Sequence, residues 1–210
     1  MLQEPLFFAL AVPAVLLAGI SKGGFGSGAS FIAGPIMMLM IEPTLALGIM
    51  MPLLLLIDMV AARPYWRKWD WPRGRMLIVA AVPGLVLGYL LLSVAPADLL
   101  RGLIGSVALL FVAWQLLGAK RYTGERQLPT WIGAMCGAVA GFTSFVSHAG
   151  GPLLAVYLLS QKIQKTTYQA TTVLIFGVLN ALKVGLYVPL GLYSAETLTA
   201  SLWLAPVAIA

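Results

Sequence analysis

The chain has 210 residues, of which 60% are hydrophobic and only 10% are charged, and its mean hydropathy is +0.95. Soluble domains carry about 25% charged residues, so this composition excludes an ordinary water-soluble domain. The net charge of +6 does not indicate a nucleic-acid-binding protein, because the basic residues stand in short segments between apolar runs. The composition therefore predicts an integral membrane protein with several spans.

Apolar segments follow one another at residues 6–20, 29–41, 44–62, 76–93, 99–118, 131–147, 152–160, 166–190 and 194–210. A straight helix needs about 20 residues to cross the hydrocarbon core. The third, fourth, fifth and eighth segments meet or approach that length. The first, second, sixth and seventh are short and form two pairs, each interrupted by Gly and Ser. Such pairs predict helices that are broken or that enter the membrane and return.

Basic residues distinguish the two sides of the membrane. Ten of the thirteen Lys and Arg residues lie in three segments, at 63–75, 120–126 and 162–165. The positive-inside rule places these loops in the cytoplasm. The N-terminus and the connections around Glu42, 96–98 and 191–196 nearly lack basic residues and are expected outside. Each short pair then begins and ends on one side, and the three spans between the pairs invert the second relative to the first.

The two halves of the chain share an order of helix breakers. An Ala-Gly pair followed by a Gly-Pro pair occurs within 18–35 and again within 140–152. The long span that comes later carries Asp58 in the first half and Asn180 in the second. We predict an all-α polytopic helical bundle of two inverted repeats with Gly-rich broken or re-entrant helices. The predicted units are a first transmembrane repeat at 1–118, a cytoplasmic linker at 119–128 and a second, C-terminally incomplete transmembrane repeat at 129–210.

The first break reads Ser-Lys-Gly-Gly-Phe-Gly-Ser-Gly at residues 21–28. Glycines leave backbone N–H groups free to point at a ligand, and a helix that starts near Ala29 adds the positive end of its dipole. Lys22 adds a full positive charge, so the segment predicts an anion site formed by Lys22, Gly23, Gly24 and Gly26. The alternatives are close helix packing through small residues and a Lys22 that reaches the membrane surface or pairs with Asp58.

The second break, at residues 141–152, holds His148, the only histidine of the chain. Ionisable residues inside a membrane are candidate functional groups by default, and a histidine can bind an anion or titrate. The alternative is a neutral imidazole that is hydrogen-bonded to a nearby carbonyl. The other candidate substrate-binding residues of this break are Ser144, Ser147, Gly150 and Gly151.

Three polar residues lie within the long spans: Asp58, Asn180 and Lys183. Asn180 and Lys183 share one helix face because they are three residues apart. Asn180 is a candidate for substrate binding, and Asp58, Lys183 and His148 are candidates for coupling or gating. A structural hydrogen bond is an equal alternative for the residues of the spans. The single Cys136 excludes an internal disulfide and a cysteine-based metal site, and no metal or cofactor is expected.

Both breaks resemble signatures of the TauE/SafE sulfite-exporter family. Residues 21–26, followed by Pro35, resemble the first signature, and residues 141–152, followed by Tyr-Leu-Leu at 157–159, resemble the second. Asp58 and the segment Tyr65 to Trp71 are also similar to this family. The resemblance implies a multi-pass transporter of the bacterial inner membrane, built from inverted repeats. It implies sulfite, sulfoacetate and related organosulfur anions as substrates.

We therefore predict secondary-active export of a small sulfur-containing anion through a midplane site between the repeats. A passive anion channel is the close alternative. An intramembrane hydrolase is a third hypothesis, because Ser144 and His148 are four residues apart, but no carboxylate or nucleophile motif lies near them. The protein is thus not expected to be an enzyme. Its expected partners are the anion and the lipid bilayer, without nucleic acid, and a homodimer is left open.

Overall fold

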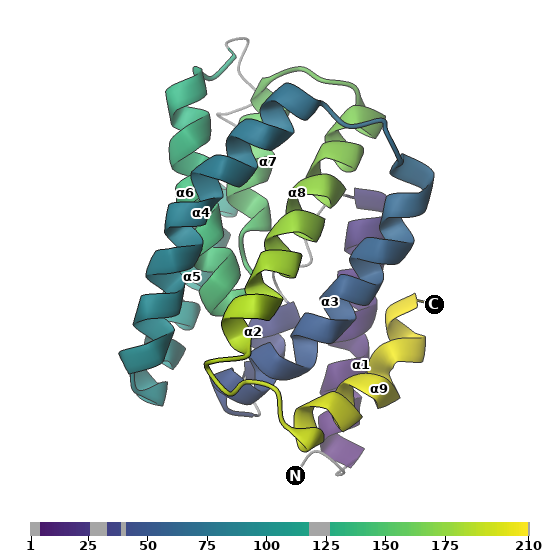
Figure 1. Cartoon of the computed structure of the whole chain (residues 1–210), viewed down its shortest axis with the longest axis vertical. Helices are drawn as coiled ribbons and strands as arrows, with labels where there is room; N and C mark the ends of the chain where they lie inside the picture. The colour runs from purple at the N-terminus through teal and green to yellow at the C-terminus, as the bar shows by residue number, and fades with distance from the viewer. Residues whose placement is uncertain (1–4, 26–32, 39–40, 118–126, 210) are drawn as a thin grey trace.

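The computed structural model of the protein describes residues 5–25, 33–38, 41–117 and 127–209. Every regular element within these ranges is helical. The elements are α1 (Pro5–Ile20), η1 (Ser21–Phe25), α2 (Ala33–Met38), α3 (Pro43–Tyr65), α4 (Trp71–Val94), α5 (Ala97–Leu117), α6 (Thr130–Ser147), α7 (Gly151–Ser160), α8 (Lys165–Tyr187) and α9 (Ala195–Ile209). Most of them run along the long axis of the molecule (Figure 1). The predicted all-α class is therefore confirmed for the described part of the chain.

Prolines and one cap mark where several helices begin. Pro43, Pro72 and Pro152 stand in the first turns of α3, α4 and α7, where a missing N–H breaks no helical hydrogen bond. Asp70 precedes α4, and its side chain accepts a hydrogen bond from the backbone N–H of Arg73 at 3.1 Å. These local signals explain why most helix boundaries fall within a few residues of the apolar segments seen in the sequence.

Four helices of the described part are long and apolar enough to cross a membrane, namely α3, α4, α6 and α8. Three of them, α3, α4 and α8, are segments for which the sequence predicts this length. The sixth segment was expected to be short, but α6 has 18 residues and meets the requirement. The fifth segment forms the 21-residue helix α5.

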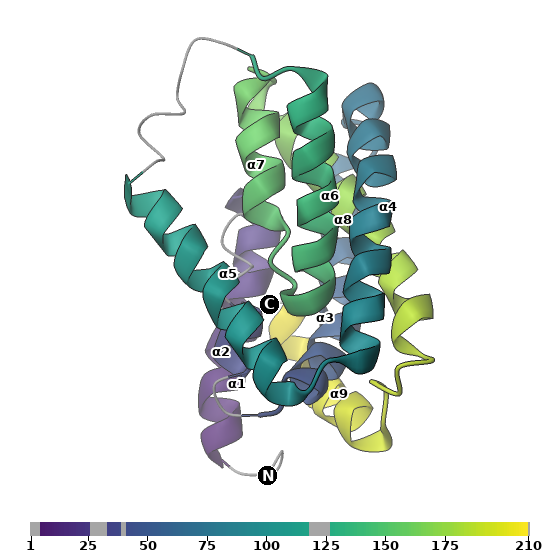
Figure 2. The same ribbon diagram turned by 90° about the vertical axis from the view of Figure 1, so that its left-hand side faces the viewer.

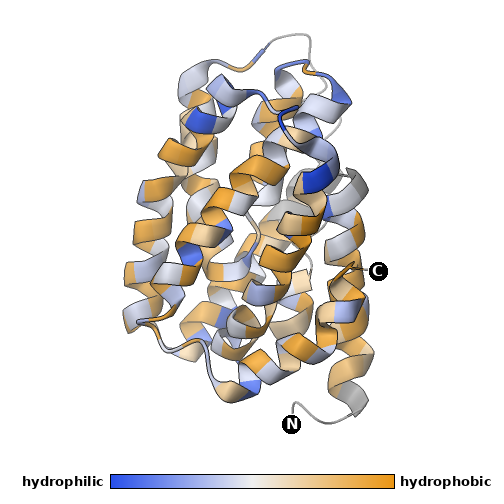
Figure 3. Cartoon of the chain, turned by 45° about the vertical axis from the view of Figure 1, so that its right-hand side comes forward, coloured by the Kyte–Doolittle hydropathy of each residue, from blue (hydrophilic) through white to orange (hydrophobic). Residues whose placement is uncertain are grey.

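The molecule exposes apolar side chains and buries polar ones. On α4, Val79, Leu87 and Leu90 are exposed, and Figure 3 shows hydrophobic residues along much of the length of the helices. The described buried side chains include those of Lys22, Asp58, Ser144, His148, Asn180 and Lys183. Water-soluble proteins rarely bury unpaired charged groups, whereas a membrane protein turns intramembrane polar residues inward. The arrangement is therefore that of a protein solvated by lipid.

The connections between helices gather at two opposite ends (Figures 1 and 2). The α3–α4 and α7–α8 connections and the start of α6 lie at one end, and the start of α1 and the α4–α5 and α8–α9 connections lie at the other. The connections at the first end are those that the sequence predicts to be basic, so we call it the basic end. This separation agrees with the predicted topology. Which compartment each end faces stays a prediction. Most of the predicted linker at 119–128, including its basic residues, lies outside the described residues.

The two predicted breaks differ in form. The second is a true interruption: α6 runs away from the basic end and α7 returns to it (Figure 2). At the first, η1 is a π-helical turn that directly prolongs α1 to Phe25, so this part is not the irregular stretch that the glycines suggested. Gly26 and the helix start expected near Ala29 lie outside the described residues. The inverted repeat itself stays a prediction.

Helices α4 and α6 pack with their backbones in close contact, through glycines on both helices. A side chain on Gly84 would collide with the carbonyl oxygen of Ala138, and one on Gly141 would collide with that of Ala81. Small residues permit such an approach between membrane helices. This contact fixes the position of α6, whose last turn carries Ser144 and leads to His148.

Candidate functional site

A first polar cluster, which we call the Asp58 cluster, consists of Lys22, Asp58 and Asn180. Lys22 Nζ lies 2.6 Å from Asp58 Oδ1, and Asn180 Nδ2 donates to Asp58 Oδ2 at 2.6 Å. All three side chains are buried, with at most 4% of any residue exposed. The pairing of Lys22 with Asp58, which the sequence left as an alternative, is therefore what the structure contains. Asp58 and Asn180, which stand in the long spans of the two halves, are in direct contact.

Side chains from α3 and α8 hold the turn that carries Lys22. Gln169 donates from Nε2 to the carbonyl oxygen of Lys22, and Tyr65 donates from its hydroxyl to that of Gly23 at 2.9 Å. Lys22 Nζ also lies 5.6 Å from the centre of the Phe176 ring, at cation–π distance. Sequence reasoning missed Gln169 and Phe176, although a glutamine one turn inside an apolar helix was a visible signal.

A second polar cluster, the Lys183 cluster, consists of Lys183, Ser144 and His148. Lys183 Nζ lies 3.0 Å from the Ser144 carbonyl oxygen, 3.1 Å from Ser144 Oγ and 3.0 Å from His148 Nδ1. Lys183 is 0% exposed. Asn180 and Lys183 stand on neighbouring turns of α8, so this helix joins the two clusters. The face that these residues were predicted to share is thus the buried one.

The backbone turns sharply where His148 enters the cluster. His148 ends α6 in the left-handed region, with φ 57° and ψ 19°, which non-glycine residues adopt uncommonly. A side chain on Gly150 would approach the Ala140 carbonyl oxygen to 2.6 Å, so the returning chain needs a glycine there. A side chain on Gly34 of α2 would approach the Ser147 carbonyl oxygen equally closely, at 2.6 Å. Helix α2 therefore packs directly against the second break.

Two polar atoms at the clusters have no hydrogen-bond partner among the described residues. They are His148 Nε2 and Asn180 Oδ1. Buried polar atoms without partners are rare and call for an explanation. Each cluster thus retains unused capacity to bind a polar ligand.

The packed rings of Tyr187 and Phe145 lie beside the Lys183 cluster, and the sequence did not predict them. Tyr187 donates from its hydroxyl to the Phe145 carbonyl oxygen at 2.6 Å, and the two rings pack edge to face with centres 5.0 Å apart. The Tyr187 ring also lies 6.3 Å from the imidazole of His148. Tyr187 is one helical turn beyond Lys183 on α8, a spacing that could have revealed it.

The charges of the two clusters do not balance. Asp58 is the only buried acidic residue in the part of the chain that the structure describes, and it serves Lys22. In the part of the chain that the structure describes, the polar contacts of Lys183 are a carbonyl, a hydroxyl and an imidazole. A buried charge without a partner costs several kcal/mol. The second lysine is therefore either uncharged or ready to receive an anion.

The structure brings together six of the residues singled out in the sequence, namely Lys22, Asp58, Ser144, His148, Asn180 and Lys183. Ser147 does not join them, because its hydroxyl donates to the Thr143 carbonyl oxygen of its own helix. Gly150 and Gly151 shape the start of α7. Gly23 and Gly24 belong to η1, and Gly26 lies outside the described residues.

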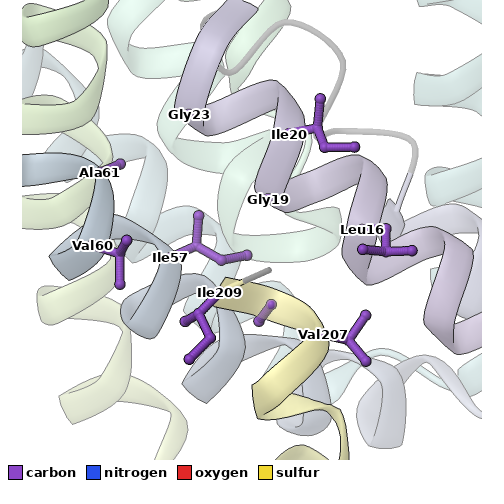
Figure 4. Close-up of a pocket in the computed structure, with 10 residues that line it drawn as sticks. Leu16, Gly19, Ile20, Gly23, Ile57, Val60, Ala61, Val207 and Ile209 are labelled. Atoms are coloured by element: carbon purple, nitrogen blue, oxygen red, sulfur yellow. The ribbon is translucent and has the colours of Figure 1, made fainter.

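A hollow of about 200 Å³ lies between α1, α3 and α9 (Figure 4). Its lining is largely apolar, with side chains such as Leu16, Ile57 and Val207. Gly23 lines it, but none of the six clustered residues does. An anion needs hydrogen-bond donors, so this hollow is not the candidate anion site.

Comparison with known proteins gives one match. Residues 11–210 match the protein family described as Sulfite exporter TauE/SafE. No curated protein and no solved structure matches the chain. The matched region contains both breaks and all six clustered residues, and this family is one of membrane transporters. Apolar outer surfaces and a polar interior are what a multi-pass membrane protein of this kind requires. The chain therefore belongs to the sulfite exporter TauE/SafE family.

Proposed function

We propose that the protein is a secondary transporter that exports a small sulfur-containing anion, such as sulfite, sulfoacetate or a related sulfonate. The observation that carries the proposal is Lys183, which is fully buried, in contact with two other polar side chains, and without a carboxylate partner in the described residues. Membrane interiors tolerate such a cation only where it has a function or a partner. The family supplies the class of anion.

The Lys183 cluster has the chemistry to bind a sulfonate or sulfite group. Lys183 can donate from its ammonium, Ser144 from its hydroxyl and His148 from a ring nitrogen. Hydrogen bonds from charged donors to anionic oxygens are short and strong. His148 Nε2, which has no partner in the described part, is available to such an oxygen.

Lys22 takes a different role in this proposal from the one that its position in the glycine-rich segment suggested. Asp58 neutralises it, so its charge is not free to attract a second anion. The Asp58 cluster instead ties η1, α3 and α8 together beside the binding site. Asp58 and Lys22 are then gating residues, because their separation would free η1 to move away from α3.

Transport requires that the site opens alternately to the two sides. Ser144, Asn180 and Lys183 are almost fully buried, so an anion reaches them only after helices move. We propose that the two repeats, residues 1–118 and 129–210, which begin with the α1–α2 and α6–α7 pairs, are inverted and rock against each other. The contact of Gly34 with the second break supports this pairing. In this proposal the basic end is cytoplasmic and the membrane is the bacterial inner membrane.

The test is transport into and out of proteoliposomes loaded with radiolabelled sulfite, sulfoacetate or methanesulfonate, with and without an imposed proton gradient. We expect accumulation against the anion gradient and its loss in Lys183→Gln. The matched control is Arg101→Gln, which removes a cation from an exposed ion pair. Movement only down the anion gradient would indicate a channel, and no movement of any of the three anions would reject the proposal.

Orientation is tested separately by cysteine labelling in a Cys136→Ser background. Single cysteines at Arg67 and Glu42 are expected to react from opposite sides of intact cells, because they belong to connections at opposite ends of the molecule. Reaction of both from the same side would reject the inverted-repeat arrangement. Labelling of Arg67 from the outside would reverse the proposed orientation.

A further inference from the structure

We infer that Lys183 is neutral in the empty transporter and takes up one proton when the anion binds. This inference rests on the proposed function and adds proton uptake at the binding step to it.

The charged side chains of the other cluster, Lys22 and Asp58, form an ion pair with Nζ and Oδ1 2.6 Å apart. Because that pair is neutral as a whole, it supplies no net counter-charge to Lys183. The imidazole of His148, from the α6–α7 break, contacts Lys183 directly, and the phenol ring of Tyr187, one turn further along α8, lies beside that imidazole. A positive Lys183 would therefore be an uncompensated buried charge, which proteins avoid by neutralising the group.

The hydrogen-bond geometry fits both protonation states. A charged ammonium has three donors, and Lys183 Nζ has three polar neighbours, the Ser144 carbonyl oxygen, Ser144 Oγ and His148 Nδ1, at 3.0–3.1 Å. A neutral amine has two donors and one acceptor lone pair. It can donate to the carbonyl and accept from the Ser144 hydroxyl or from His148, both of which can act as donor or acceptor. Lys183 can thus change protonation without losing a partner or changing position.

An anion at this cluster favours the charged lysine. A negative group within a few ångströms stabilises the ammonium, and by linkage a ligand that prefers the protonated state binds together with the proton. The balance for a sulfonate is one anion plus one proton plus the neutral amine, which together give an ammonium–sulfonate pair with no net charge. Such a neutral pair avoids most of the cost of moving a charge through an apolar interior.

The experiment counts protons during binding. Isothermal titration calorimetry of the purified protein with methanesulfonate or sulfoacetate, both of fixed charge near neutral pH, is repeated in two buffers with different heats of ionisation. The buffer dependence of the binding heat gives the proton uptake, and we expect about one proton per anion. Lys183→Arg, which stays charged, should bind the anion with no proton uptake. Lys183→Gln should take up none and bind more weakly.

His148→Gln is the control that separates the two titratable groups of the cluster. Proton uptake near one that persists in His148→Gln supports Lys183 as the acceptor. Uptake that is lost in His148→Gln but persists in Lys183→Arg assigns the proton to the histidine and overturns the inference. Anion binding by wild type without proton uptake overturns the inference but leaves the proposed function intact. Failure of the folded protein, checked by size-exclusion chromatography, to bind either sulfonate or sulfite overturns both.

Discussion

Two buried lysines, one from each half of the chain, differ in whether a carboxylate of the described residues contacts them. Lys22 has Asp58 as a counter-ion at 2.6 Å. Among the described residues, the polar partners of Lys183 are a carbonyl, a hydroxyl and an imidazole. Both are almost fully buried, so burial alone does not distinguish a structural charge from a functional one. The presence or absence of a carboxylate does, because it decides whether the charge is already balanced.

Disturbing the surroundings of each lysine should therefore have a different kind of effect. Disturbing the Asp58 cluster should change the free energy of unfolding, since it would leave one buried charge unpaired. Disturbing the Lys183 cluster should chiefly change anion affinity, since no counter-ion in the described residues would be orphaned. Variants that fail to follow this division would contradict the separate roles of the two lysines.

The largest expected effect is that of Asp58→Asn. The amide keeps the shape of the side chain but leaves Lys22 buried without a counter-ion, which should lower the free energy of unfolding by about 3–5 kcal/mol. Unfolding of the purified protein in mixed detergent and SDS micelles measures this change. The matched control is Asp98→Asn, in the exposed pair with Arg101, which should change stability little.

The double variant Lys22→Met/Asp58→Leu sharpens this test. It removes both charges, so it should recover most of the stability that Asp58→Asn loses. A double variant as unstable as the single one would mean that Asp58 acts through Asn180 rather than through Lys22. An Asp58→Asn protein as stable as wild type would contradict the structural role of the pair.

Lys183→Met should produce the next largest effect, and on affinity rather than stability. Loss of a hydrogen bond from a charged group is worth about 1.5–3 kcal/mol, which corresponds to a roughly 10- to 150-fold higher Kd. The free energy of unfolding should not fall as it does in Asp58→Asn. Titration with sulfoacetate gives the first quantity, and the SDS unfolding assay gives the second. A variant that unfolds readily would place Lys183 with Lys22 as a structural residue.

The sequence predicted much of this fold because lipid imposes simple rules. Apolar length, proline position and the distribution of basic residues all act locally, and they located the helices and the two ends. The form of the first break was harder to foresee: residues that looked irregular prolong α1 as a π-helical turn. Glycine content does not separate a flexible loop from a helix that packs closely, because glycine permits both.

The sequence singled out the polar residues that meet in the two clusters, but it left open how they pair. Asp58, Asn180, Lys183, Ser144 and His148 stood out as polar groups in apolar segments. Which lysine faces the carboxylate depends on how α3, α6 and α8 pack, and no local pattern states that. Gln169 and Tyr187 stood at visible positions in the sequence, but each acts through a distant backbone carbonyl. Which carbonyl a side chain reaches depends on how the helices pack.

Gly84→Ala tests whether the close packing of α4 and α6 positions the Lys183 cluster. The added methyl would collide with the Ala138 carbonyl oxygen, and such overpacking costs about 1–3 kcal/mol. Because α6 carries Ser144, sulfoacetate affinity should fall as well. Gly105→Ala in α5 is the matched control, because an added methyl there meets nothing within 4 Å. Equal behaviour of the two variants would exclude a role of this contact.

The smallest expected effect is that of Tyr187→Phe. This variant tests whether the Lys183 cluster alone determines anion affinity. The variant removes one hydroxyl that holds the Phe145 carbonyl oxygen at 2.6 Å, next in the chain to Ser144. Loss of this bond should lower the free energy of unfolding by about 0.5–1.5 kcal/mol. It should also weaken sulfoacetate binding a few-fold, because Ser144 loses part of its support.

Tyr65→Phe is the control. The Tyr65 hydroxyl donates to the Gly23 carbonyl oxygen beside Lys22, so its removal should leave sulfoacetate affinity unchanged. If Tyr65→Phe weakens binding as much as Tyr187→Phe does, the turn that carries Lys22 also touches the anion, and the division between the two lysines fails.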